Sequence, residues 1–463
     1  MDGALLRRWC LAWLAVGALG CSFYAPELGD CTLKCSASAE CPENMTCRGG
    51  VCRSGTSTAG CGCVPGDTQT CGTNVGECRV GTQTCRAGGV WSECTGGVGP
   101  SAEVCDGKDN DCDGLIDLGP VVELASDLSS TWRLHGWDAG YALVHTRAAG
   151  GAEELVVTWL NRSLSPLATS APLRSGPTAD AVTASVGSTI FAAFATEDGG
   201  LSVLSATPAG SQTPFEPVPQ AGRPLKLHLG ASQLLVANWM TTATSTASPH
   251  PRLARWNLDG TLQQVVDLDV VDGGRLGVSP YGCNLSVQGH YSIYLADPSA
   301  ATQRRIVQDT RTLEVLRTDA PYFGESFAKV IEQPSGAISS TYTYANVGQT
   351  WSGVYFNPDL LGTVAEKVLA ESHADSTVWG DSDATLDADG HIAIVYMDRA
   401  AGRLVLARSV GGGALAANPN TVTLEPGSGY GSPRLAQSGN DAMLGLAWAT
   451  GSHISARRVC GAK

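Results

Sequence analysis

Residues 384–408 read ATLDADGHIAIVYMDRAAGRLVLAR. Apolar side chains recur at every second position through Ile392, Ile394 and Tyr396, which is the period of a β-strand. Glycine closes the turn on each side of this strand, at Gly390 and Gly402, where the backbone has to reverse. The stretch therefore predicts three short antiparallel strands joined by tight turns.

The same unit recurs along the chain after about residue 120, for example at residues 182–206. The first turns of seven such units lie roughly 50 residues apart, near Gly140, Gly187, Ala231, Gly282, Gly336, Gly390 and Asn440. One unit of three or four strands cannot bury both of its faces, but seven units around an axis can. We therefore predict an all-β fold in which residues 120–463 form a β-propeller with seven blades. A pair of β-sandwiches, or another blade number, is the alternative.

The strand after residue 120 provides a way to close the ring. Val121, Val122 and Leu124 are predicted to complete the last blade beside residues 454–459, which would remove the exposed sheet edges. Tryptophans are expected to fill the gaps between blades rather than to line a sugar-binding face. They are Trp132, Trp137, Trp159, Trp239, Trp256, Trp351, Trp379 and Trp448.

Length and charge narrow the class of protein. A chain of 463 residues is expected to form two or three domains. Its 43% hydrophobic content suffices for buried cores, while 56 glycines, 23 prolines and only 16% charged residues indicate many turns and few helices. The formal net charge of −14 argues against nucleic acid as a partner, because phosphate binding needs a basic surface.

Cysteine content indicates the compartment. Thirteen of the 17 cysteines fall between residues 31 and 112. They are Cys31, Cys35, Cys41, Cys47, Cys52, Cys61, Cys63, Cys71, Cys78, Cys85, Cys94, Cys105 and Cys112. This density is typical of a disulfide framework formed outside the cytoplasm. Zinc is the alternative, but the stretch has no histidine and no repeated Cys-x-x-Cys pair. We expect one cysteine-rich module at residues 31–52 and a second at 61–96, with connectivity left open.

The N-terminus is typical of an export signal. Arg7 and Arg8 precede an apolar run ending at residue 19, which is short for a membrane span. We predict a signal peptide at residues 1–20 and a lipid on Cys21, because Ala18-Leu19-Gly20-Cys21 resembles a bacterial lipobox with its leucine one position late. The alternative is ordinary signal cleavage with Cys21 in a disulfide. Residues 21–30 would form a tether. The lipid would be the only contact with a membrane and would place the protein at the outer membrane or cell surface. The alternative is a secreted protein.

Residues 97–119 hold the most specific motif, CDGKDNDCDGLID at 105–117. Counted from Asp109, acidic residues occupy positions 1, 3, 5 and 9 and Gly114 occupies position 6, which is the spacing of an EF-hand-type calcium loop. The predicted calcium ligands are Asp109, Asp111, Asp113, the carbonyl of Leu115, Asp117 and Asp106. Position 12 is Pro120 instead of a bidentate glutamate, so Asp106 or Glu103 could complete the site. The alternative is a metal-free acidic turn closed by a Cys105–Cys112 disulfide.

This motif resembles the Asp-rich metal-binding motif of secreted bacterial proteins, especially myxobacterial lipoproteins, and also the aspartate loops of thrombospondin type 3 repeats. The preceding CGTNVGEC, GTQTC and GVWSEC segments resemble the module that often comes before it. The resemblance covers residues 61–117. Some relatives are described as copper-binding surface proteins, but carboxylate oxygens suit calcium and neither His nor Met lies nearby in sequence.

Function is less clearly encoded than fold. Gly-x-Ser-x-Gly, His-Glu-x-x-His and P-loop motifs are absent. The acidic group Asp381, Asp383, Asp387 and Asp389 is interpreted as a solvated loop in preference to a metal site. We expect a surface binding or adhesion platform for an unknown protein or glycan ligand. The alternative is an extracellular polysaccharide hydrolase or lyase with its site in the propeller cavity. Cys283 and Cys460 could pair with each other, or one could tie the domain to the cysteine-rich region.

Overall fold

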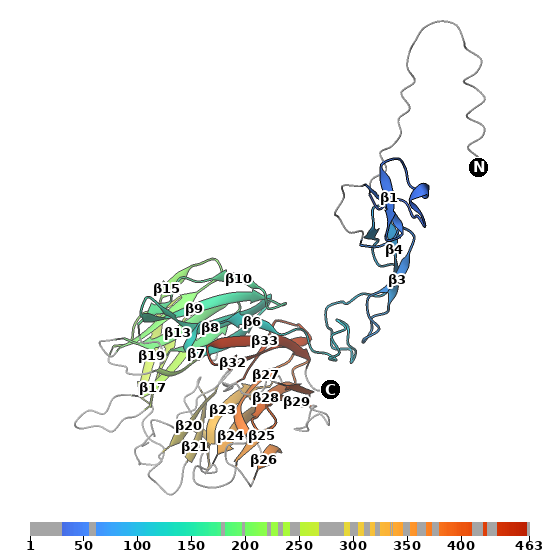
Figure 1. Ribbon diagram of the computed structural model, residues 1–463. Coiled ribbons are helices and arrows are strands. Elements are labelled where there is room, and N and C mark those ends of the chain that lie inside the picture. The colour runs from blue at the N-terminus through green and yellow to red at the C-terminus, as the bar shows by residue number, and fades with distance from the viewer. Residues whose placement is uncertain are drawn as a thin grey trace, which may run out of the picture. The chain divides into compact units, whose positions relative to one another are not determined.

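The computed structural model describes residues 30–54, 62–176, 181–196, 200–219, 224–229, 235–240, 251–267, 291–296, 304–309, 315–319, 325–333, 335, 337–345, 352–358, 367–372, 379–409, 420–423 and 433–460 (Figure 1). The predicted signal peptide, Cys21 and Cys283 lie outside them. The chain divides into two compact units, residues 1–100 and 101–463. Among the described residues the only helical element is the 3-10 turn η1 (Ser38–Glu40), so the all-β prediction is confirmed.

The first unit consists of two small sheets stapled by disulfides. One is the hairpin of β1 (Met45–Arg48) and β2 (Val51–Ser54); the other contains β3 (Thr68–Cys71), β4 (Gly81–Arg86) and β5 (Val90–Trp91). The disulfides of this unit include Cys35–Cys47, Cys41–Cys52, Cys63–Cys85 and Cys71–Cys94. Each expected module thus has at least two disulfides of its own, which take the place of a hydrophobic core in so short a segment.

Seven antiparallel sheets form in the described part of the second unit, which confirms the predicted seven blades. Blade one holds β7 (Leu128–Trp137), β8 (Gly140–Ala149), β9 (Ala152–Asn161), β10 (Pro166–Thr169) and β11 (Arg174–Ser175). Blade two holds β12 (Val182–Val186), β13 (Thr189–Ala195), β14 (Leu201–Ala206) and β15 (Gln212–Pro214). Blade three holds β16 (Pro224–Leu229), β17 (Leu235–Met240), β18 (Pro251–Trp256) and β19 (Leu262–Asp267). Blade four holds β20 (Tyr291–Ala296), β21 (Arg304–Asp309) and β22 (Val315–Asp319).

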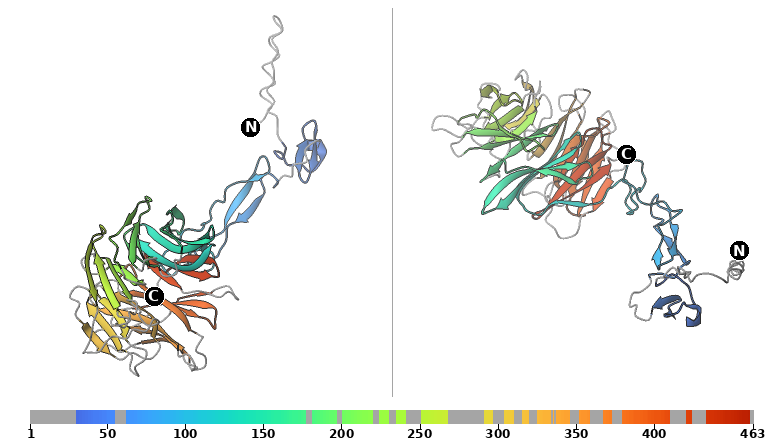
Figure 2. Two further views of the ribbon diagram at one scale, coloured as in Figure 1. Left: turned by 90° about the vertical axis from the view of Figure 1, so that its left-hand side faces the viewer. Right: turned by 90° about the horizontal axis from the view of Figure 1, so that it is seen from above.

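The remaining three blades complete the ring. Blade five holds β23 (Glu325–Glu332), β24 (Ile338–Ala345), β25 (Ser352–Asn357) and β26 (Lys367–Ser372). Blade six holds β27 (Trp379–Leu386), β28 (Ile392–Asp398), β29 (Arg403–Arg408) and β30 (Asn420–Thr423). Blade seven holds β31 (Arg434–Gln437), β32 (Met443–Thr450), β33 (His453–Cys460) and β6 (Val122–Ala125). The left view of Figure 2 shows the sheets following one another around a ring in chain order.

Blade seven closes the ring as the sequence predicts. Its strand β6 comes from the start of the domain and pairs antiparallel with β33 near the end of the chain, Ile454 facing Ala125 and Ala456 facing Val122 (Figure 1). The first strand of this blade, β31, also contacts the first strand of blade one, β7. The last strand of the chain, β33, is therefore paired on both sides, by β32 and by β6, and is not a free edge.

Neighbouring blades bury both faces of each sheet against one another. In β28, Ile392 and Ile394 pack with residues of blade five, among them Phe356. The alternate residues of the same strand, Val395 and Met397, pack instead with residues of blade seven. This is the reason why β28 is buried along its whole length, as a strand between two sheets must be.

Two tryptophans occupy gaps between blades, as predicted. Trp159 of blade one is fully buried and clusters with Ile190 of blade two. Trp256 of blade three is fully buried as well and clusters with Phe191 of blade two. Each ring thus contributes to the contact between two neighbouring sheets, where large aromatic side chains can fill the space between twisted strands.

Candidate metal centre

The acidic loop, residues 103–117, belongs to the propeller unit and is attached to its last strand. Cys105 forms a disulfide with Cys460 at the end of β33, across a sequence separation of 355 residues. The pairing of Cys105 with Cys112 is therefore wrong, and Cys112 is disulfide-bonded in its own right. A Cys283–Cys460 pair is excluded as well, and the partner of Cys460 lies in the acidic loop of the same unit, outside both cysteine-rich modules. The observed disulfide is therefore long-range and links the start of the second unit to its last strand.

The buried carboxylate of Glu103 binds backbone amides of the acidic loop. Its Oε1 accepts hydrogen bonds from the amides of Asn110 (2.5 Å) and Asp111 (2.7 Å). Asp109 acts similarly, since its Oδ2 accepts a hydrogen bond from the amide of Gly114 at 3.0 Å. Gly114 has a φ of 90°, a conformation that favours glycine and that turns the chain back on itself. The loop thus folds around two carboxylates that each use one oxygen for the backbone.

The second oxygens of these two carboxylates have no hydrogen-bond partner within the described structure. Glu103 Oε2 and Asp109 Oδ1 are both buried in this state, and the two residues are only 5% and 6% exposed. One carboxylate oxygen from each of Glu103, Asp109 and Asp111 lies within 4.8 Å of the others. Buried carboxylates in such proximity are unfavourable unless a cation or a proton offsets their charge. The group therefore has the composition of a hard-cation site.

The pKa directions agree with this environment. Burial raises the pKa of Glu103, and the hydrogen bonds from the Asp111 and Asn110 amides offset part of that rise. Burial also raises the pKa of Asp111, and the negative charge of Asp113 adds to the effect. Each shift means that the charged form is disfavoured by the surroundings. A divalent cation bound among these oxygens would reverse that preference.

The structure places the predicted ligands in two groups. Asp109 and Asp111 lie together with Glu103, which the spacing argument offered only as a substitute for position 12. Asp113 and Asp106 are exposed. Asp113 accepts a hydrogen bond from the amide of Leu115 at 2.8 Å, and Asp106 accepts one from the amide of Lys108 at 3.0 Å.

Asp117 is buried and takes a structural role within the loop. Its Oδ1 accepts a hydrogen bond from the amide of Gly107 at 2.9 Å, and its backbone has a φ of 59°. Leu115 carries an exposed side chain. The described carboxylate group accordingly consists of three residues, and further ligands would have to come from backbone carbonyls and water, both of which calcium accepts.

A buried arginine lies on the propeller side of the loop. Arg457 of β33 is 5% exposed and donates from Nε to the carbonyl of Gly119 at 2.8 Å, and from Nη2 to that of Leu118 at 3.4 Å. Burial lowers its pKa, while the charges of Asp113 and Asp111 act in the opposite direction. Arg457 therefore places a positive charge near the loop but bonds to backbone carbonyls. Among the described contacts, the carboxylate group has no direct cationic partner.

A second acidic cluster, in the first turn of blade six, is satisfied by arginine. Arg408 pairs with Asp387 through Nε and with Asp389 through Nη2 (2.6 Å), and it lies 3.0 Å from Nδ1 of His391. Asp383 bonds elsewhere, accepting from the amide of Leu435 at 2.9 Å. The side chain of Asp381 lies outside the described part. The guanidinium occupies the place that a cation would need, so this cluster is an ion-pair network.

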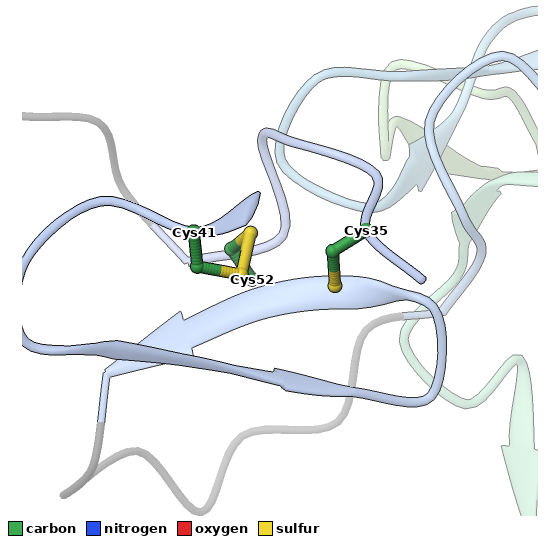
Figure 3. A group of neighbouring side chains, drawn as sticks. All are labelled: Cys35, Cys41 and Cys52. Carbon is green, nitrogen blue, oxygen red and sulfur yellow. A yellow bond between two sulfur atoms is a disulfide. The ribbon is translucent and has the colours of Figure 1, made fainter. Parts of the chain in front are cut away.

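A third group of potential ligands is used up by disulfides. Cys35, Cys41 and Cys52 lie close together beside the hairpin of the first unit (Figure 3). Cys41 is bonded to Cys52, as the figure shows, and Cys35 is bonded to Cys47. Sulfurs in disulfides do not bind zinc as thiolates do, so the disulfide interpretation is confirmed for these residues. The disulfides also indicate an exported or extracellular protein.

The described part of the chain contains no helix that is both long enough and apolar enough to span a membrane. Its sheets define a protein of the β-propeller class. No family model and no curated protein matches the chain. Among solved structures it is similar to the β-propeller domain of Cps50 (Swd1) from Myceliophteria thermophila, with a TM-score of 0.46 and 11% identity over 73% of this chain and 99% of that one.

Two further solved structures show the same kind of likeness. The WD40 domain of Toxoplasma gondii coronin gives a TM-score of 0.48 at 11% identity, covering 75% of this chain and 88% of that one. The periplasmic gluconolactonase PpgL of Pseudomonas aeruginosa gives 0.41 at 14% identity, covering 69% and 96%. At these identities the likeness concerns the fold alone.

Proposed function

We propose that this protein is an exported binding protein of the cell surface, whose propeller presents a face to a protein or glycan ligand and whose acidic loop holds a calcium ion. A lipid on Cys21 would anchor it at the outer membrane or cell surface. The observation that carries the calcium proposal is the pair of buried, unpartnered oxygens, Glu103 Oε2 and Asp109 Oδ1, beside Asp111.

Calcium fits this group better than softer metals do. All three side chains offer carboxylate oxygen, and hard oxygen ligands favour calcium or magnesium over zinc and copper. Calcium tolerates irregular geometry and a mixture of carboxylate, carbonyl and water ligands, whereas magnesium demands a near-ideal octahedron. With only three carboxylates the expected dissociation constant is roughly 0.1–1 mM, as in extracellular calcium modules.

Calorimetric titration of calcium into the oxidised, metal-stripped chain tests the proposal. The intact propeller unit is required, because Cys105 in the loop is bonded to Cys460. Glu103→Gln and Asp109→Asn should each abolish saturable binding. Asp106→Asn is the matched control, because Asp106 is exposed, lies outside the carboxylate group, and among the described residues accepts only from the Lys108 amide and, at 3.5 Å, from Nδ2 of Asn110. Equal heats from all four proteins, or loss of binding in Asp106→Asn alone, would contradict the ligand set.

The anchor and the ligand need separate experiments. Mass spectrometry of the protein extracted from membranes should find the diacylglyceryl modification on Cys21, and a Cys21→Ser variant should be released. Cells that display the chain without residues 101–463, which removes Cys105 together with Cys460, should lose binding to the ligand or surface that the full chain attaches to. Turnover of a polysaccharide by the purified chain would instead favour the hydrolase or lyase alternative.

A further inference from the structure

The closure of the propeller continues beyond β6. The three residues Asp117, Leu118 and Gly119 run along β33 just before β6 does. The amide of Cys460 donates to the carbonyl of Asp117 (3.1 Å), and the amide of Gly119 donates to the carbonyl of Arg458 (3.0 Å). Leu118 forms an antiparallel bridge with Val459 between these two hydrogen bonds. The end of the acidic loop is therefore part of the strand pairing that closes the ring.

The start of the acidic loop is attached to the same blade. Cys105 is bonded to Cys460, and its Sγ lies 3.3 Å from the carbonyl oxygen of Ala442, in the connection between β31 and β32. Both ends of the loop are thus held on blade seven, at one end by a disulfide and at the other by main-chain hydrogen bonds. Asp109 and Asp111 lie between these two attachments in sequence, and Glu103 lies two residues before the first of them.

Asp117 forms hydrogen bonds with residues near both attachments. Its carboxylate accepts from the amide of Gly107, two residues after Cys105, while its carbonyl accepts from the amide of Cys460. Glu103 holds the middle of the loop by accepting from the amide of Asp111. Repulsion among the neighbouring carboxylates strains this arrangement, and a cation bound there would relieve that strain. Opening the loop at either end would separate the oxygens that the cation needs.

We propose that a divalent cation at Glu103, Asp109 and Asp111 acts as a clasp on the propeller, so that cation binding and the pairing of residues 117–125 with β33 stabilise each other. This inference rests on the calcium site proposed above. It follows from linkage, since a ligand that binds only the closed form stabilises that form in proportion to its saturation. Reciprocally, closure strengthens cation binding by the same factor by which the cation strengthens closure, so a change that lowers the closed fraction raises the apparent dissociation constant in proportion.

Hydrogen exchange of the oxidised full chain, with and without calcium, tests the clasp. At a calcium concentration 100 times the calorimetric dissociation constant, opening of the closure should slow by about 100-fold. The slowing should appear in peptides covering 117–125 and 453–460, and not in 189–206 of blade two. In Glu103→Gln it should vanish everywhere. Asp387→Asn, which alters a carboxylate in a different cluster, should keep the full effect.

The reciprocal measurement uses the closure itself. A Cys105→Ser, Cys460→Ser double variant should bind calcium at least about fivefold more weakly than the parent chain, the lower end of couplings between linked sites. Suppose that calcium binds this variant with unchanged affinity and does not alter hydrogen exchange at residues 117–125 and 453–460. The proposed coupling between cation binding and ring closure is then wrong, while the calcium site itself stands. If calorimetry finds no saturable binding in the parent chain, the proposed site itself fails.

Discussion

The indole of Trp159 in blade one donates a hydrogen bond from Nε1 to the carbonyl oxygen of Ser188 in blade two, at 2.8 Å. Ser188 lies in the turn between β12 and β13, one of the turns whose regular spacing predicts the blades. A fully buried aromatic ring and a directed hydrogen bond therefore fix the position of one blade against the next.

Two substitutions of Trp159 should separate the contribution of its hydrogen bond to stability from that of its packing. Trp159→Phe keeps most of the ring but leaves the Ser188 carbonyl without its donor, so we expect a loss of about 1–3 kcal/mol in the free energy of unfolding. Trp159→Ala should cost about 3–5 kcal/mol, because it also leaves a cavity. Denaturant titration followed by fluorescence measures both. Trp91→Phe, in the separate first unit, is the control and should leave the propeller transition unchanged.

Gly136 marks where blade one meets blade seven. A Cβ built at Gly136 would overlap the carbonyl oxygen of Gln437 in β31, and no flexible side chain is available to move aside. We expect Gly136→Ala to destabilise the propeller by at least the roughly 1–3 kcal/mol typical of overpacking. At Gly119 the nearest atom would be 3.5 Å away, an ordinary contact, so Gly119→Ala is the matched control. Equal melting temperatures for the two variants would show that the strands separate easily.

His145 should make stability depend on pH. It is 5% exposed, and burial lowers its pKa, although the nearby Asp127 at 3.1 Å opposes that shift. The unfolded chain, with an ordinary histidine pKa of about 6.5, then binds more protons than the folded chain as the pH falls below that value. Stability is therefore full above about pH 6.5 and falls as the pH is lowered toward the folded pKa.

The measurement is the urea midpoint of the parent and of His145→Gln at about pH 7.5 and about pH 5.5, on either side of the ordinary pKa. Acidification should lower the midpoint of the parent more than that of the glutamine variant, which cannot take up a proton. Parallel losses in the two proteins would assign the acid sensitivity to other groups.

The ion-pair network of blade six should behave as a structural element. Asp387→Asn weakens the pair with Arg408, while Asp387 Oδ1 also accepts from the amides of Asp389 (3.0 Å) and His391 (2.9 Å). We expect a loss of about 1–3 kcal/mol in unfolding free energy. Calcium binding should be unaltered, since Arg408 already neutralises this cluster. A lower calorimetric calcium stoichiometry in this variant would show that a cation also binds there.

The blades were predictable because they depend on local signals. Alternation at Ile392, Ile394 and Tyr396 and the evenly spaced turns follow from the strand period and from glycine, both of which act over a few residues. Gly187 and Gly390 do separate the first two strands of their blades, and Gly282 lies outside the described residues. Ring closure was also predictable, since only a strand near residue 120 remained to pair with residues 454–459.

The candidate site was only partly predictable, because its geometry depends on distant contacts. Asp109 and Asp111 follow from the loop spacing, whereas Glu103 lies outside that spacing and the sequence offered it only as an alternative to Asp106 for completing the site. Asp117 fits the spacing, yet its carboxylate is taken by the amide of Gly107. Cys105 could not be assigned to Cys460 from spacing, since covalent pairing over such a separation depends on the closed ring.

Blade seven also sets an order of events in the synthesis of the protein. Its outer strand β6 is made before the other six blades, and its partner β33 is among the last segments to emerge. The ring therefore cannot close on a partly translocated chain, and the thiol of Cys105 cannot find Cys460 before then. The Cys105–Cys460 disulfide can therefore form only after the last strand of the propeller has been made, and a chain truncated before residue 460 would leave Cys105 without this partner.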